Sequence, residues 1–265
     1  MPKYRSLRGF LEQTPPTINC ICYDGALRNA NEFPLYGIRV NGAVLFADLP
    51  GYSALARRFS AEECGFMTNH FFAWIEAAAI RHFGGIVDKF IGDEVMIIFA
   101  SDFDEKDPLE SALRTAKIIV ETDLFPFEPR IGVASGEFLI ATVGTRQRFE
   151  VSAIGHTVNL AARCVGKAEP SLIKIATTNR ELIGKIFEDE SWRGEGSQSE
   201  ELKNVGKAEV ITIRRKGFRI LSFDYEQMVR DAVADAQDPT KLQGKTPLWK
   251  WQGEAEDQGK NEGHP

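Results

Sequence analysis

The stretch IVDKFIGDEVMIIFA, at residues 86–100, consists of two apolar runs separated only by Gly92 and Asp93. Two strand-like runs joined by Gly and Asp are a signal for a β-hairpin with a two-residue turn. The stretch therefore predicts an antiparallel pair of strands that carries a carboxylate, Asp93, at its tip.

A second carboxylate ends another apolar run. In VLFADLPGYSAL, at residues 44–55, Asp48 follows a buried-strand pattern and is followed at once by Pro and Gly. Asp and Gly are ordinary turn residues, so Asp48 also has a purely structural interpretation. If the two strands are neighbours, Asp48 and Asp93 meet at one edge of the sheet. Two carboxylates without Cys or His companions suit Mg²⁺ or Mn²⁺, and the turn would leave the N–H groups of Gly51 and Tyr52 free to face a triphosphate.

Helical and strand-like patterns interleave around these two stretches. The expected helices are SAEECGFMTNHFFAWIEAAAIRHFGG at 60–85, PLESALRTAKIIVETDL at 108–124, HTVNLAARCVGKA at 156–168 and TNRELIGKIF at 178–187. RIGVAS and FLIATVG are expected to form a strand pair that turns at Ser135 and Gly136, and LIKIAT a further strand. The predicted fold class is α+β, with helices packed on a mixed, mostly antiparallel sheet.

Composition narrows the classes of function. The chain has 265 residues, of which 43 % are hydrophobic and 26 % charged, and its formal net charge is −6. An acidic protein is a poor candidate for general binding to nucleic acid or anionic membranes, and no apolar run approaches the ~18 residues that span a bilayer. Four cysteines (Cys20, Cys22, Cys64 and Cys164) show neither a disulfide framework nor metal-ligand spacing. We therefore expect a cytoplasmic protein with reduced thiols.

The pattern divides the chain into three parts. Residues 1–37 contain few periodic signals and are expected to form an N-terminal arm, and residues 38–222 form the main domain. Residues 223–265 are expected to form a helix and a polar, Gly-rich, disordered tail, with Trp249 and Trp251 docking before it.

Four motifs together resemble one known family. FADLPGYSALA, DKFIGDEVMIIFA, RIGVASGEF and IGHTVNLAARC occur in the order and at the spacing of the class III nucleotidyl cyclase catalytic domain. The resemblance implies a ferredoxin-like palm fold and a head-to-tail homodimer with active sites between the subunits. It also implies two divalent cations per site, Mn²⁺ or Mg²⁺, and conversion of a nucleoside triphosphate to a 3′,5′-cyclic nucleotide and pyrophosphate.

The resemblance assigns catalytic roles to matching residues. Asp48, Asp93 and the backbone carbonyl of Leu49 match the metal-binding positions. Asn159 and Arg163 match the pair that the opposite subunit supplies, and their spacing of four places both on one helix face. Arg163 is expected to neutralise charge at the α-phosphate, and Asn159 to hold the ribose.

Lys89 and Ser152 match the base-recognising positions, although a strand-surface Lys and a strand Ser have structural interpretations too. Tyr52, where Phe is common, is a candidate for narrowing the base site, and Gly51 for contacting phosphate. His156 stands where the family usually has Asp or Asn, and either caps the helix or faces solvent.

The motifs indicate the base of the nucleoside triphosphate less clearly than they indicate the family. YGIRVNGAVLFADLPGYSALA and IGHTVNLAAR, with no fused sensor in the chain, resemble the pyrimidine cyclases of Pycsar antiphage systems, whose cyclic nucleotide activates a separate effector protein. We expect UTP to be converted to cyclic UMP, with CTP and ATP as the alternatives, since Lys89 and Ser152 also suit those bases. A non-catalytic nucleotide-binding module is a remote alternative. A palm-type polymerase is set aside, because the chain lacks a basic surface for a template.

Overall fold

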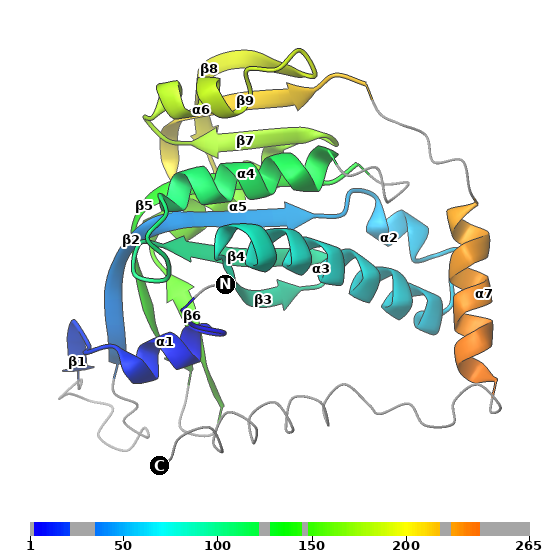
Figure 1. Ribbon diagram of the computed structural model, residues 1–265, viewed down its shortest axis with the longest axis horizontal. Helices are drawn as coiled ribbons and strands as arrows, with labels where there is room; N and C mark the ends of the chain where they lie inside the picture. Colours follow the sequence, from blue (N-terminus) through cyan, green and yellow to red (C-terminus); the bar gives the residue numbers. More distant parts are fainter. Residues whose placement is uncertain (1–2, 22–34, 122–127, 145–147, 218–223, 239–265) are drawn as a thin grey trace.

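The computed structural model describes residues 3–21, 35–121, 128–144, 148–217 and 224–238, in which helices and strands alternate along the chain (Figure 1). The helices are α1 (Leu7–Gln13), α2 (Tyr52–Leu55), α3 (Ala61–Phe83), α4 (Pro108–Glu121), α5 (His156–Lys167), α6 (Arg180–Ile186) and α7 (Tyr225–Gln237). The strands are β1 (Ile18–Ile21), β2 (Leu35–Asp48), β3 (Ile86–Ile91), β4 (Glu94–Ala100), β5 (Arg130–Gly144), β6 (Phe149–Ile154), β7 (Leu172–Ala176), β8 (Trp192–Leu202) and β9 (Gly206–Arg215).

The described strands form one sheet in the order β3-β4-β2-β5-β7-β9-β8, with β1 paired to β2 and β6 paired to β5. Every pairing is antiparallel except that of β5 with β7. The expected α+β class with a mixed, mostly antiparallel sheet is confirmed, and so is the hairpin of β3 and β4 around Gly92 and Asp93.

The central strand β2 is buried on both faces, so helices cover the sheet from both sides. Ala43, Leu45 and Ala47 belong to one core cluster, while Val44 and Phe46 alternate into the other. Helices α3, α4 and α6 contribute to the first cluster, and α1 and α5 to the second. In Figure 1, α3 and α4 lie over one face of the sheet. The three layers leave the ends of the strands as the accessible edges.

The long helix α3 begins and ends where its sequence predicts. Ser60 and Glu63 form the capping box, each side chain accepting a hydrogen bond from the other residue's backbone N–H. Gly84 ends the helix in the left-handed conformation, with φ of 70°. Phe71 and Ile75 are almost completely buried, so this face of the helix belongs to the core.

The expected strand pair around Ser135 and Gly136 is wrong. Residues 130–144 form the single strand β5, which stays in register with β2 from Arg130 opposite Asp48 to Ala141 opposite Gly37. Gly136 lies opposite Gly42 within this ladder, and a Cβ added to it would stand 2.8 Å from Oγ1 of Thr157 on the helix α5. The glycine therefore leaves room for the Thr157 side chain and does not mark a turn. The hairpin occurs later, between β5 and β6.

The two ends of the chain add helices to the layers. Leu7, Phe10 and Leu11 of α1 are buried, so this part of the expected arm is packed onto the second core cluster. Helix α7 packs against α3, beside which it lies in Figure 1. Trp249, Trp251 and the predicted tail lie outside the described residues. Within the described part, no helix is long and apolar enough to cross a membrane.

Helix α5 lies unusually close to β5. A Cβ added at Gly132 would stand 2.3 Å from the backbone N of Val165 and 2.4 Å from the backbone O of Ala161. Both are main-chain atoms of α5, so they cannot rotate away as a side chain can. The absence of a side chain at Gly132 therefore fixes how closely α5 packs on the sheet.

Replacing Gly132 by Ala should displace α5 and lower the free energy of unfolding by about 3 kcal/mol, the upper range for overpacking a core. Urea unfolding followed by circular dichroism measures the loss. Gly166→Ala on the same helix is the matched control, because a Cβ there meets nothing within 4 Å. That control should gain about 0.5–1 kcal/mol from helix propensity. Equal midpoints for wild type and Gly132→Ala would refute the close-packing account.

A buried hydrogen bond joins β3 to β6. The hydroxyl of Ser152 donates to Oδ2 of Asp88 at 2.7 Å, and the backbone N–H of Ala153 donates to the same oxygen at 3.4 Å. The other carboxylate oxygen, Oδ1, is buried without a hydrogen-bond partner among the described residues. Burial raises the pKa of Asp88 to about 6, against the opposing effects of the Ser152 hydrogen bond and the charge of Lys89. The ionised carboxylate is therefore a destabilising element of this junction.

The pKa of Asp88 is higher in the folded than in the unfolded chain, so the protonated carboxyl group is favoured by folding. The stability that this group contributes is fully present below pH 3.8 and is lost as the pH rises through about 6. Asp88→Asn should remove this loss. The fall in unfolding free energy between about pH 4 and about pH 7 should be smaller in the variant by about 2 kcal/mol. Denaturant titrations at both pH values test this, and an identical fall in both proteins would contradict it.

Candidate active site

Asp48 ends β2 between charged residues of both neighbouring strands. In the ladders it stands opposite Glu94 of β4 and opposite Arg130 of β5. Its side chain is buried, and Oδ2 accepts a hydrogen bond and ion pair from Nε of Arg130. The prediction that the strands of Asp48 and Asp93 are neighbours is confirmed, since β2 pairs directly with β4.

Asp93 and Glu94 are electrostatically coupled to Asp48. Burial, followed by the charge of Asp48, raises the pKa of Asp93, while its own backbone N–H and Arg130 lower it. Burial and the charge of Asp48 likewise raise the pKa of Glu94 to about 7. Three carboxyl groups thus gather at this edge with one guanidinium, and their mutual repulsion favours the approach of a cation.

The donor set fits a hard divalent cation that also binds substrate oxygens. Two carboxylates, Asp48 and Asp93, together with the Leu49 carbonyl are the kind of ligands that Mg²⁺ uses when phosphates and water complete its shell. The described residues contain no cluster of three or more His, Cys, Asp or Glu that could hold a metal alone. The site therefore suits a substrate-associated ion more than a permanently enclosed one.

The turn after Asp48 is only partly as expected. Gly51 has a φ of 80°, a left-handed conformation that favours glycine, and it precedes α2. The Tyr52 N–H donates to the Leu49 carbonyl at 3.3 Å, so the prediction that it is free for phosphate is wrong, while Gly51 stays a candidate. The Tyr52 ring packs against the first core cluster, and its hydroxyl lies 3.0 Å from Oγ1 of Thr68 on α3. Packing against α3 gives no support to the expected role of Tyr52 in narrowing the base site.

Asn159 and Arg163 project from α5 into solvent. The opposite side of the helix, including Ala161 and Cys164, is fully buried against the sheet. His156 is also exposed and Gly155 is the N-cap residue, so of the two expectations for His156 the structure shows the solvent-facing one.

The catalytic residues predicted from the motifs fall into separate groups within one chain. Among the described residues, no hydrogen bond or ion pair links Asn159 or Arg163 to Asp48 or Asp93. Asp48 and Asp93 share one sheet edge, whereas the other two residues stand on the exposed surface of α5. The structure thus places the two pairs of residues on different elements of the fold.

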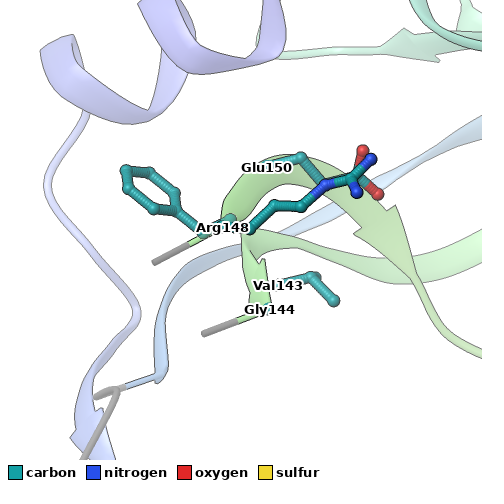
Figure 2. Close-up of a pocket in the computed structure, with 5 residues that line it drawn as sticks. Val143, Gly144, Arg148 and Glu150 are labelled. Atoms are coloured by element: carbon teal, nitrogen blue, oxygen red, sulfur yellow. The ribbon is translucent and has the colours of Figure 1, made fainter. Parts of the chain in front are cut away.

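Lys89 and Ser152 are brought together where β3 faces β6. Lys89 forms an ion pair of 2.5 Å with Oε1 of Glu150, and Ser152 is held by Asp88 as described above. Glu150 also lines a cavity of about 330 Å³ at the β5–β6 hairpin. Figure 2 shows the side chain of Arg148, which precedes β6, and that of Glu150 extending toward the same side.

Four charged residues of these sites were missed by sequence reasoning. Arg130 and Glu94 each stand directly before an apolar strand run, and such a charge at a strand end was the available signal. Asp88 adjoins Lys89, and Glu150 lies two residues before Ser152, the two predicted base-recognising residues. The contacts between side chains of β3 and residues of β6 could not be predicted from one sequence.

Known sequences and structures are similar to this chain. An uncharacterized protein of Mycobacterium tuberculosis, Rv1320c, is 32 % identical over 145 residues, which cover 54 % of this chain and 25 % of that protein. The uncharacterized Mycobacterium bovis protein Mb1352c is 35 % identical over 124 residues, covering 46 % and 23 % respectively. The matched part of this chain thus spans about a quarter of the length of these relatives.

Solved cyclase structures share the fold. The adenylyl cyclase CyaB of P. aeruginosa superposes with a TM-score of 0.56 at 23 % identity, covering 70 % of this chain and 99 % of that one. The guanylate cyclase domain of RhGC from Catenaria anguillulae, in complex with GTP, gives a TM-score of 0.57 at 21 % identity, covering 67 % and 98 %. Residues 39–214, about two thirds of the chain, match the family described as the adenylate and guanylate cyclase catalytic domain. The chain therefore belongs to this family, the class III nucleotidyl cyclases.

Proposed function

We propose that the protein is an active nucleotidyl cyclase that converts a nucleoside triphosphate to a 3′,5′-cyclic nucleotide and pyrophosphate. The observation that carries this proposal is the meeting of Asp48 and Asp93 at one sheet edge, in a chain whose α5 also presents Asn159 and Arg163. A degenerate, binding-only member of the family would be expected to have lost one of these four residues.

Asp48, Asp93 and the Leu49 carbonyl would hold the divalent cations of the site. When bound, such ions supply positive charge that stabilises the attacking and departing oxygens. Burial and then repulsion from Asp48 raise the pKa of Asp93, and the same positive charge would relieve the repulsion. Arg130, which pairs with Asp48, would hold that carboxylate in position.

In the proposed reaction, a bond forms between the ribose O3′ and the α-phosphorus, and the bond from the α-phosphorus to the oxygen of the β-phosphate breaks. The proton of the 3′-hydroxyl passes to solvent, and pyrophosphate leaves. Arg163 neutralises the charge that grows on the α-phosphate, and Asn159 orients the ribose by a hydrogen bond. Both residues must therefore face a bound triphosphate.

A head-to-tail homodimer would bring the two half-sites together. The separation of Asn159 and Arg163 from the metal-binding edge within one chain supports this arrangement. Four large apolar side chains on β3 and β6 are exposed by about a third to a half, which favours burial by a second copy. These residues are Phe90, Ile91, Phe149 and Ile154.

We further propose that UTP is the substrate and cyclic UMP the product, in an antiphage role in which a separate effector protein reads the product. The sequence resemblance to the Pycsar pyrimidine cyclases supports this assignment, together with Lys89 and Ser152 at the base-recognising positions. ATP and CTP remain the competing substrates, because the hydrogen-bonding groups of those bases can pair with the same side chains.

Incubating the purified chain with ATP, GTP, CTP or UTP and Mn²⁺, with product identification by mass spectrometry, tests the proposal. Cyclic UMP should dominate, and excess chelator should abolish product. Asp93→Ala should lower the rate about a thousandfold, because a ligand of the ions is lost. Dominant cyclic AMP would overturn the uridylate assignment alone. Full turnover in excess chelator would show that Asp48 and Asp93 are turn residues only.

A further inference from the structure

We infer that Glu150, paired with Lys89, is a specificity-determining residue that distinguishes a keto base from an amino base. This inference rests on the proposed cyclase function and deepens it. It concerns which side chain of β6 supplies the hydrogen-bond acceptor for the base, the role that the family motif alone gives to Ser152.

Ser152 is committed to the interior of the protein. The residue is only 2 % exposed, and its hydroxyl donates to Oδ2 of Asp88 at 2.7 Å. A hydroxyl has one proton, so this hydrogen bond leaves Ser152 no donor for a ligand, and its burial keeps its acceptor lone pairs away from one. The Ala153 N–H, which donates to the same oxygen at 3.4 Å, helps to hold the carboxylate in place. Ser152 therefore fastens β6 to Asp88 of β3.

Glu150 has the exposure that Ser152 lacks. Its side chain is 58 % exposed and that of Lys89 is 27 % exposed, so both reach solvent. Their polar atoms meet at 2.5 Å between Nζ and Oε1. Residues two apart in a strand share one face, so Glu150 and Ser152 leave β6 on the same side. At this side of the strand, Glu150 reaches solvent, whereas Ser152 is buried. The Asp88–Ser152 hydrogen bond thus holds the exposed pair in register.

The pair carries one fixed donor and one fixed acceptor. Lys89 can only donate, and an ionised Glu150 can only accept. Uracil offers O4 as acceptor and N3–H as donor, whereas cytosine offers a donor at the 4-amino group and an acceptor at N3. The positions of donor and acceptor are exchanged between these bases, and likewise between guanine and adenine. A rigid Lys–Glu pair can therefore match one class and leave polar groups unpaired with the other.

The decisive variant is Glu150→Gln, because an amide of the same shape can either donate or accept. The ratio of kcat/KM for UTP to that for CTP should fall at least about tenfold, since a site that hydrogen-bonds a base edge rejects the wrong pattern strongly. If the wild type prefers a purine, the same change is measured in the ratio of GTP to ATP. Glu150 is exposed, so the melting temperature should stay unchanged.

Two further variants separate recognition from structure. Ser152→Ala should lower the melting temperature while keeping the base ratio within about threefold. Asp189→Asn removes a similar Lys–carboxylate contact, from Lys117 at 2.6 Å with side chains 22 % and 43 % exposed, and should leave the ratio unchanged.

An active wild type whose base ratio is unchanged in Glu150→Gln would overturn the inference and leave the cyclase proposal standing. A base ratio that moves in Ser152→Ala but not in Glu150→Gln would return the role to Ser152. A wild type that forms no cyclic nucleotide from any of the four triphosphates would instead refute the proposed function.

Discussion

The gathering of three carboxyl groups around one guanidinium at the end of β2 is the constraint on which the rest of the site depends. The register of β2 with β4 and β5 places Asp48 opposite Glu94 and Arg130, and the β3–β4 turn adds Asp93. Burial and like charge raise the pKa values of Asp93 and Glu94. Such an arrangement is tolerable when positive charge approaches it, and in the proposed reaction the divalent cations would supply that charge.

The position of helix α5 depends on a different constraint, the close approach of its backbone to the backbone of β5. Because Gly132 has no side chain, α5 lies directly against β5, and its exposed face presents Asn159 and Arg163 at a fixed height above the sheet. Nothing in the described part of a single chain joins that face to Asp48 and Asp93. Placement of both residue groups on one scaffold supports the proposed head-to-tail pair of chains.

Much of the fold follows from local sequence signals. The capping box at Ser60 and Glu63, the Gly92–Asp93 turn and the apolar helix faces all indicated elements that the structure confirms. Gly136 was misread because a glycine can mark either a turn or a place where another side chain packs closely on a strand, and only the long register with β2 distinguishes the two. The meeting of Asp48 and Asp93 could be predicted because Asp48 ends one apolar strand run and Asp93 occupies the turn of a hairpin.

Contacts between segments far apart in the sequence could not be predicted in the same way. Asp88 and Glu150 find their partners, Ser152 and Lys89, only because β6 lies beside β3. Likewise, the packing of α3 places Thr68 next to the Tyr52 hydroxyl. A single sequence carries no signal for such pairings, since they depend on how the sheet is ordered. Motif resemblance thus supplied the candidate residues, and the structure shows which side chains contact them.

The shared site is tested most directly by mixing two inactive chains. Asp48→Ala removes one half-site and Arg163→Ala the other, so each homodimer should be inactive. In an equal mixture with free exchange, half of the dimers carry both chains and one of their two sites is whole, which predicts about a quarter of wild-type activity. Absence of any recovery, with subunit exchange demonstrated by differently tagged chains, would contradict the account.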